Sequence, residues 1–261
     1  IYSISNIITR GISIILVPLY TRVLSPADYG IIDMVAVVTN LVNLTVALEI
    51  TQGVARFFSE CKKQSDKIGY ASSSLWFTMF MYTVFAFLIL LFPQQLSMWI
   101  LGSVERVDLF KIVVASIWLN GIFYLLQNQL RWGLQSKECA VTGIICSLTS
   151  IAVTVLCVIW WQLGVVGVFW GLIGGNLIGG ILAFYYARHN FRLTIDWDKL
   201  VNMLHFSTPL VPSSIGVFIA LYIDRIVIKE LLTFTDLGLY GIGYRVASLV
   251  KLVEVKYQQP D

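Results

Sequence analysis

The run CAVTGIICSLTSIAVTVLCVIWWQLGVVGVFWGLIGGNLIGGILAFYYA, from Cys139 to Ala187, contains no charged residue. A water-soluble domain would need charged side chains to cover so much surface, whereas the hydrocarbon of a bilayer accepts such a run. The run is long enough for two membrane-spanning helices, and we predict that they divide near Gln162 to Gly164. It therefore indicates a membrane protein.

The rest of the chain has the same character. Of its 261 residues, 57% are hydrophobic and only 13% are charged. We predict an all-α membrane protein with about eight transmembrane helices, each of roughly 20 residues. Because residue 1 already lies in an apolar stretch and residues 258–261 form no obvious terminus, we expect the chain to be part of a longer one. The six spans outside the charge-free run are expected near residues 1–19, 31–52, 71–92, 112–130, 206–224 and from 237 onward.

Lys and Arg residues fall on alternate connections between the predicted spans. The connections after the second, fourth, sixth and eighth spans hold eleven of the eighteen, and the opposite connections hold five. Because Lys and Arg are enriched in cytoplasmic loops, we predict that the even connections and the N-terminus are cytoplasmic. We expect a multi-pass protein of the inner (plasma) membrane.

Two short segments indicate an internal repeat. LSPADYGII (24–32) and TDLGLYGIG (235–243) each place an acidic residue shortly before Tyr-Gly-Ile, 211 residues apart. Such a repeat across six spans is typical of transporters built from two parallel lobes, and an interfacial turn used twice is the alternative. We predict a six-span lobe over residues 1–187, a cytoplasmic interfacial linker over 188–202, and the first two spans of an incomplete second lobe over 203–261.

Charged side chains inside spans are costly and therefore indicate function. Arg10 lies halfway along the first span, and Arg245 lies eight or nine residues inside the eighth. We predict that both line a water-filled substrate path, and the alternative for Arg10 is a side chain that reaches the interface. Glu49, near the end of the second span, is a candidate to pair with a cavity arginine or to take up a proton. Its alternative is an interfacial pair with Arg56.

Asp224 and Arg225 end the seventh span, and two prolines lie near its beginning. Adjacent residues on a helix point about 100° apart, so Asp224 and Arg225 need not pair with each other. We predict that they lie on the substrate path, with one of them facing the interface between the lobes. The alternative is a helix end that reaches the outer headgroups. Pro209 and Pro212 remove backbone donors and predict a bending gate, or else a simple kink at the start of the helix.

Several classes of protein are excluded by what the sequence lacks. A net charge of +3 is too weak to indicate nucleic-acid binding. The sequence contains no phosphate-binding Gly-Lys loop, no nucleophile elbow and no paired metal ligands. We therefore predict no catalytic residues, no metal and no cofactor, and a protein that is not an enzyme.

Four pieces of the sequence resemble a known family. They are PLYTRVLSPADYG (18–30), HFSTPLVPSS (205–214), YIDRIVI (222–228) and LGLYGIGYRVASLV (237–250). In order and spacing they are similar to the polysaccharide (O-antigen) flippases of the multidrug, oligosaccharidyl-lipid and polysaccharide exporter superfamily. The resemblance implies a V-shaped transporter with 12–14 helices, of which this chain would hold the first lobe and the start of the second.

The resemblance also implies a function. Such a flippase moves a polyprenyl-pyrophosphate-linked oligosaccharide from the cytoplasmic to the periplasmic leaflet by alternating access, for O-antigen, capsule or exopolysaccharide synthesis. The anionic pyrophosphate would need cationic side chains, so Arg22, from the first of these pieces, joins Arg10 and Arg245 as a candidate. The membrane potential or a coupled ion, H⁺ or Na⁺, would supply the energy. The expected partners are the bilayer, a polysaccharide polymerase and other assembly proteins.

Two other functions compete with this one. A cation-coupled multidrug or metabolite antiporter of the same fold would need a carboxylate deep in a span, and Glu49 lies near an end. A membrane enzyme acting on lipid-linked sugars would need a large polar outer loop or clustered acidic residues. The longest outer connection, 93–111, offers only Glu105 and Asp108.

Overall fold

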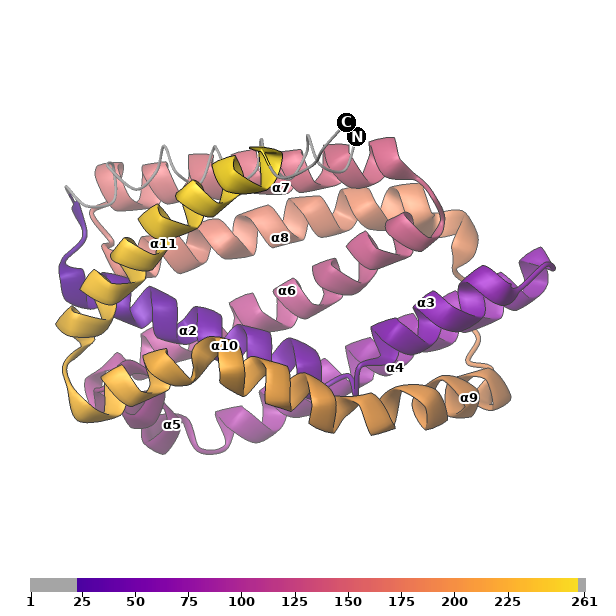
Figure 1. The fold of residues 1–261 in the computed structure, drawn as a ribbon, viewed down its shortest axis with the longest axis horizontal. Helices are drawn as coiled ribbons and strands as arrows, with labels where there is room; N and C mark the ends of the chain where they lie inside the picture. Colours follow the sequence, from indigo (N-terminus) through magenta and orange to yellow (C-terminus); the bar gives the residue numbers. More distant parts are fainter. Residues whose placement is uncertain (1–22, 258–261) are drawn as a thin grey trace.

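The structure is a computed structural model that describes residues 23–257 (Figure 1). Every regular element in this part of the chain is helical. Short 3₁₀ helices and one π-helical turn, Leu156–Trp160, join or extend the main helices. The main helices are α2 (Pro26–Thr45), α3 (Ile50–Glu60), α4 (Gln64–Leu90), α5 (Pro93–Leu101), α6 (Val107–Trp132), α7 (Ser136–Val155), α8 (Val165–Ala187), α9 (Trp197–Ser207), α10 (Val211–Leu231) and α11 (Phe234–Tyr257).

Six helical stretches in the described part are long and apolar enough to cross a membrane. They correspond to the predicted second to seventh spans. The charge-free run divides into α7 and α8 at a turn that ends in Gly164, as predicted. The helix α11 covers the predicted eighth span, and the predicted first span lies outside the described residues.

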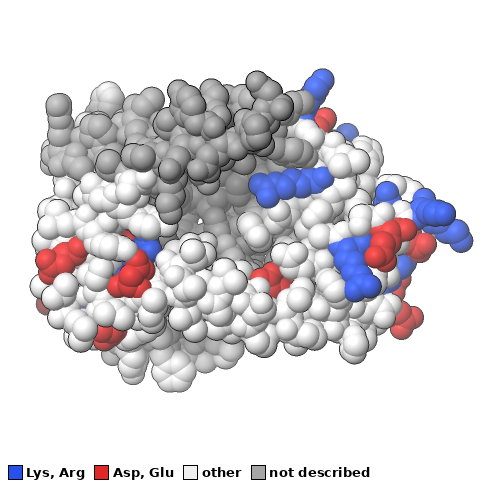
Figure 2. All heavy atoms as spheres, viewed as in Figure 1, with Lys and Arg blue, Asp and Glu red and all other residues white. Residues whose placement is uncertain are grey.

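The outer surface of the helices is strongly apolar. Phe80 and Phe87 on α4 are each 64% exposed, and Trp160 is 80% exposed. Exposed apolar surface of this extent marks a lipid-facing protein. In Figure 2 most charged side chains on the face shown lie toward the two ends of the helices. These features agree with an all-α membrane fold.

Small residues bring α7 and α8 close together, as the spacing in GLIGGNLIGG predicts. A methyl group added at Gly171 would collide with Thr154, and one at Gly175 would collide with the backbone of Cys146. The large side chains of the core, including Tyr82, Phe110 and Phe169, are almost fully buried between α4, α6 and α8. The helices α2 to α8 therefore pack as one bundle.

The predicted second span is not one continuous helix. The helix α2 ends at Thr45, and a turn over residues 46–49 precedes α3. Leu48 and Glu49 have φ values of 50° and 52°, which is the left-handed region that non-glycine residues seldom adopt. The span therefore breaks at Glu49, whereas the sequence predicted a continuous helix with Glu49 near its end.

Candidate functional site

The helices α2 and α11 begin with the same capping arrangement. The Ser25 hydroxyl accepts a hydrogen bond from the Asp28 backbone N–H, and the Asp28 carboxylate accepts one from the Ser25 N–H. Thr233 and Asp236 repeat both bonds at the beginning of α11. A side-chain oxygen at the N-cap satisfies a backbone donor that has no partner within the helix. The two helices therefore begin with the same local structure.

The same two helices touch through glycines. A methyl group at Gly30 of α2 would collide with the carbonyl of Phe234, and one at Gly238 of α11 would collide with the carbonyl of Pro26. The contact is reciprocal, as expected where two equivalent helices cross. The corresponding residues of the two helices are all 208 positions apart: Ser25 and Thr233, Pro26 and Phe234, Asp28 and Asp236, and Gly30 and Gly238.

The matching caps and glycines of α2 and α11 have a different offset from the repeat predicted from the sequence. The predicted offset of 211 aligns Tyr29 with Tyr240, whereas the matching caps and glycines require an offset of 208. The difference of three residues is close to one helical turn. It arises because sequence identity favoured the Tyr-Gly-Ile letters, while the backbone contact depends on the cap and on Gly238.

A buried ion pair lies just beyond this crossing. The Arg225 Nε of α10 donates to the Asp33 Oδ2 of α2 at 2.9 Å. Asp33 is only 8% exposed and Arg225 only 5%. Gly241 of α11 leaves room for the Asp33 carboxylate, because a methyl group there would lie 3.0 Å from its carbon. Three helices therefore enclose this pair.

Several groups surround the Arg225 guanidinium. Its Nη1 donates to the Leu221 carbonyl at 3.2 Å and to Asp224 Oδ1 at 3.3 Å. Its carbon lies 4.3 Å from the centre of the Tyr244 ring, a distance at which a cation is attracted to the ring face. The Tyr240 hydroxyl donates to the other oxygen of Asp224. These contacts fix the guanidinium from both α10 and α11.

Arg245 is the second cation of the cluster. Its Nη2 lies 3.5 Å from Asp33 Oδ1, so the Asp33 carboxylate lies between two arginines. The Arg245 side chain is 37% exposed, and its guanidinium carbon lies 5.9 Å from the centre of the Tyr29 ring. Arg245 is therefore more accessible than Arg225. We call Asp33, Asp224, Arg225 and Arg245, together with Tyr240, the ion cluster.

The cluster unites three residues that the sequence predicted separately. Asp224, Arg225 and Arg245 were each predicted on the substrate path, and the structure brings them together around Asp33. The adjacent Asp224 and Arg225 do form an ion pair, at 3.3 Å. Asp33 was not predicted. A lone carboxylate early in a span gives no sign of whether it faces water or a partner, and its partner is 192 positions away.

The remaining predicted residues lie elsewhere. Arg10 and Arg22 lie outside the described residues. Glu49 is 6% exposed at the break between α2 and α3. Its suggested partner Arg56 instead forms an ion pair with Glu60, at 3.6 Å. The cluster therefore lies apart from Glu49.

Pro209 and Pro212 lie where α9 passes into α10. Pro209 is in the 3₁₀ turn Thr208–Leu210, and Pro212 is in the first turn of α10. On one side of this turn, α9 packs so closely on α3 that a methyl group at Gly53 would meet the Met203 backbone at 2.9 Å. On the other side, α10 packs against α2 and α11. The prolines therefore mark a change of packing partner.

The segment before α9 is fixed to α4. The Ser72 hydroxyl accepts from the Arg192 N–H and the Ser73 hydroxyl from the Asp196 N–H, both at 2.8 Å. Lys199 Nζ forms two ion pairs, one with Asp66 of α4 at 3.1 Å and one with Asp196 at 3.0 Å. The hydrogen bond from Lys199 holds the pKa of Asp196 below its ordinary value. The linker is therefore attached to the first bundle.

The sequence profile of the family described as "Polysaccharide biosynthesis protein" matches residues 1–255. The chain belongs to this polysaccharide biosynthesis protein family. The match confirms the resemblance that the four sequence pieces indicate. In the described residues, no group of three or more His, Cys, Asp and Glu side chains is placed to hold a metal ion.

Two proteins to which this chain is similar are transport proteins rather than enzymes. The succinoglycan biosynthesis transport protein ExoT of Rhizobium meliloti is 22% identical over 249 residues, which are 92% of this chain and 47% of the relative. A solved multidrug resistance MATE family transporter of the MOP superfamily, in an inward-facing conformation, has a TM-score of 0.70 at 15% identity. The match covers 95% of this chain and 58% of that transporter. The chain thus spans about half the length of the relatives it matches.

Proposed function

We propose that the protein is a flippase that carries polyprenyl-pyrophosphate-linked oligosaccharide across the inner membrane during polysaccharide synthesis. The observation that carries this proposal is the ion cluster, where Asp33 and Arg225 are buried together at the crossing of α2, α10 and α11. Family membership and the transporter fold support it. In this proposal the cluster closes one end of the substrate path.

The distribution of charge supports an orientation. Four basic residues lie where α3 and α4 meet, at the end opposite the crossing of α2 and α11 (Figure 1): Arg56, Lys62, Lys63 and Lys67. By the positive-inside rule that end is cytoplasmic. The crossing, with Asp28 and Asp236 at the beginnings of its two helices, is then on the periplasmic side. The path is closed toward the periplasm.

The arrangement of α2 and α11 supports alternating access. The two helices cross near their beginnings and diverge toward their other ends (Figure 1). In this proposal, the substrate path between them opens toward the cytoplasm while the crossing is intact. We place the boundary between the lobes at the turn Thr208–Leu210, because α9 packs on the first bundle and α10 on α2 and α11. Pro209 and Pro212 would then provide the bend.

The chemistry of the cluster suits an anionic substrate. Asp33 forms ion pairs with both Arg225 and Arg245 while the crossing is closed. A pyrophosphate offers the same kind of oxygen with more charge, and arginine binds phosphates in charge-assisted pairs. A substrate that binds Arg245, the more exposed arginine, would compete with Asp33 for it. The ion pair that joins α2 to α11 would then weaken. Binding of the substrate would thus loosen the crossing that must open to release it.

An antiporter is the second candidate, because Asp33 is a carboxylate buried within a span. In that function Asp33 would carry the coupled cation. Its two arginine partners oppose this use, because they already occupy both carboxylate oxygens, at 2.9 and 3.5 Å, and a coupled cation would have to displace them. The cluster therefore favours transport of an anion.

The test is a flipping assay on the full-length protein in proteoliposomes with lipid-linked oligosaccharide. We expect Arg225→Gln and Arg245→Gln to slow flipping about tenfold or more, because each removes charge-assisted hydrogen bonds. Lys229→Gln, one turn further along α10 and outside the cluster, is the matched control and should flip at the wild-type rate. Normal flipping by both arginine variants at equal membrane levels would refute the site. An inactive wild type that exports small cations in exchange for H⁺ or Na⁺ would favour the antiporter.

A further inference from the structure

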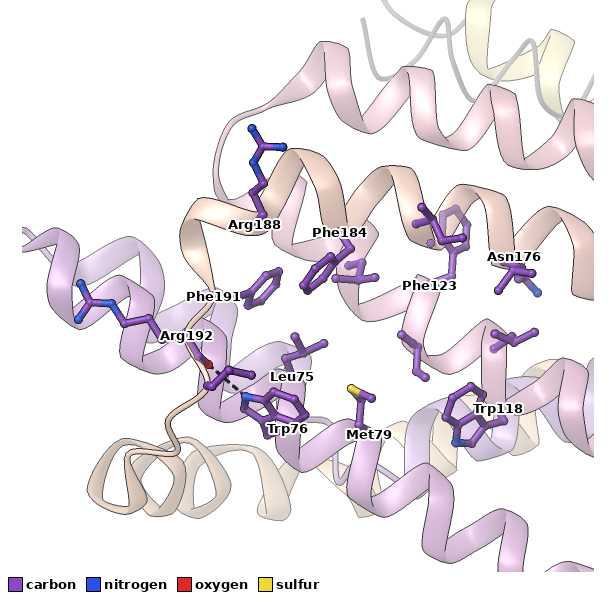
Figure 3. A pocket seen from close by; sticks show the side chains of 17 residues that line it. Leu75, Trp76, Met79, Trp118, Phe123, Asn176, Phe184, Arg188, Phe191 and Arg192 are labelled. Carbon is purple, nitrogen blue, oxygen red and sulfur yellow. Dashed lines mark hydrogen bonds between the residues drawn. The ribbon is translucent and has the colours of Figure 1, made fainter.

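A long apolar groove lies on the surface of the bundle, between α4, α6 and α8 (Figure 3). Its volume is about 550 Å³, within the range of sites that bind small molecules. Of the 17 lining residues, all except Asn176, Arg188 and Arg192 are apolar. None comes from α2, α10 or α11, so the groove is separate from the ion cluster.

Two arginines lie at one end of the groove. Arg188 follows the end of α8, and Arg192 lies in the linker that the α4 serines hold. Figure 3 shows both side chains at this end, extending away from the apolar lining. Both residues are exposed, and in the described part of the chain neither has an acidic side chain within ion-pair distance. Their charges are therefore available to a ligand.

The end of the groove is firmly built. Trp76 Nε1 donates to the Arg192 carbonyl at 3.1 Å, and the Phe184 and Phe191 rings stack with their centres 5.8 Å apart. The Arg188 guanidinium lies 4.1 Å from the centre of the Tyr185 ring. These contacts fix the backbone around both arginines and leave the guanidinium groups at the rim.

The length of the groove matches one leaflet of a bilayer. Along α8 it extends from Asn176 to Arg188, which at the helical rise of 1.5 Å per residue is about 18 Å. Half of the hydrocarbon thickness is about 15 Å. A lipid chain that begins at the arginines therefore ends near the middle of the membrane, at Asn176.

We propose that this groove binds an anionic diacyl phospholipid of the surrounding leaflet. One acyl chain lies along α4, α6 and α8, and the phosphate group pairs with Arg188 and Arg192. A lipid from the same leaflet fits better than the carrier lipid of the substrate, because the groove stops halfway across the membrane and does not reach the ion cluster. The proposal does not depend on what the protein transports.

Native mass spectrometry of the delipidated full-length protein tests this site, with phosphatidylglycerol as the probe and phosphatidylcholine as its zwitterionic counterpart. An arginine near an anionic lipid contributes roughly fivefold in affinity, so two give a preference of about thirtyfold. We expect R188Q/R192Q to lose this preference. The control is R131Q, at the end of α6 and outside the groove, which should keep it.

A second variant tests the apolar part of the site. A methyl group added at Gly180 meets no neighbouring atom, and Gly180 lines the groove, so the longer side chain of Gly180→Leu should extend into it without disturbing the helix. It should weaken the binding of both lipids, while Gly216→Leu, at an equally open position on α10, should not. A phosphatidylglycerol preference that survives R188Q/R192Q would overturn the proposal, as would wild-type binding by Gly180→Leu. Binding of polyprenyl phosphate in place of phosphatidylglycerol would also overturn it.

Discussion

Gly30 and Gly238 lie where α2 and α11 cross. Each faces the carbonyl group of the first residue of the other helix, Phe234 for Gly30 and Pro26 for Gly238. This contact joins the first bundle to the helices that follow the prolines. It lies beside the buried Asp33–Arg225 pair, and in the proposed mechanism the crossing and the ion cluster close one end of the path together.

Gly238→Ala should destabilise the protein although alanine favours helices. The added methyl group would collide with the Pro26 carbonyl, and overpacking of this kind costs about 1–3 kcal/mol. Gly243→Ala, on the same helix, meets no neighbouring atom and should gain up to about 1 kcal/mol from helix propensity. Thermal unfolding in detergent measures both. Equal shifts of the two variants would contradict the close crossing.

Asp33→Asn should be strongly destabilising, because it leaves Arg225 buried without its closest ionic partner. Breaking a buried pair costs about 3–5 kcal/mol. Asp33→Asn combined with Arg225→Gln should recover part of this loss, since no unpaired buried charge remains. Lys111→Gln, which removes the exposed pair with Asp108, should leave the unfolding temperature unchanged. Additive effects of the Asp33 and Arg225 substitutions would show that they do not interact.

Ser72→Ala and Ser73→Ala should each release one end of the linker. The lost hydroxyls accept from the Arg192 and Asp196 amides, and a hydrogen bond of this kind is worth about 1 kcal/mol. Hydrogen exchange of these two amides should become about fivefold faster. Ser74→Ala is the matched control, because its hydroxyl bonds only within α4. Unchanged exchange in the first two variants would show that the linker is held by other contacts.

The attachment of the linker should weaken in acid. The folded-state pKa of Asp196 is depressed by Lys199, so its stabilisation is fully present above the ordinary Asp pKa of about 3.9. That stabilisation is lost as the pH falls through the lower, folded-state pKa. Proteolysis within residues 191–196 by an acid-active protease should therefore increase at low pH. Asp196→Asn should be equally susceptible across this range, and a wild-type acid dependence in the variant would implicate another group.

The sequence predicted the membrane fold well because hydropathy and loop charge are local properties. The turn between α7 and α8 and the presence of Arg245 within α11 both follow from such local signals. The break at Leu48 and Glu49 was missed, since no glycine or proline marks it and both residues adopt a left-handed conformation that their side chains disfavour.

The site was predicted only in part. Arg225 and Arg245 stand out because charge is rare within spans. Asp33 does not, because its role depends on the approach of α10 and α11, which begin about 200 positions later. The correspondence of Gly30 with Gly238 was missed for a similar reason. Gly238 is recognisable as the partner of Gly30 only once the crossing is seen.

The most direct test of the proposed closure is the distance between the beginnings of α2 and α11 during transport. Spin labels at the exposed positions Val23 and Leu239 of the full-length protein would report it by double electron–electron resonance. The account predicts one short distance in the resting protein and a second, longer distance when lipid-linked oligosaccharide is added. Asp33→Asn should show the longer distance without substrate. A single unchanged distance in a preparation that flips its substrate would contradict the claim that this crossing opens.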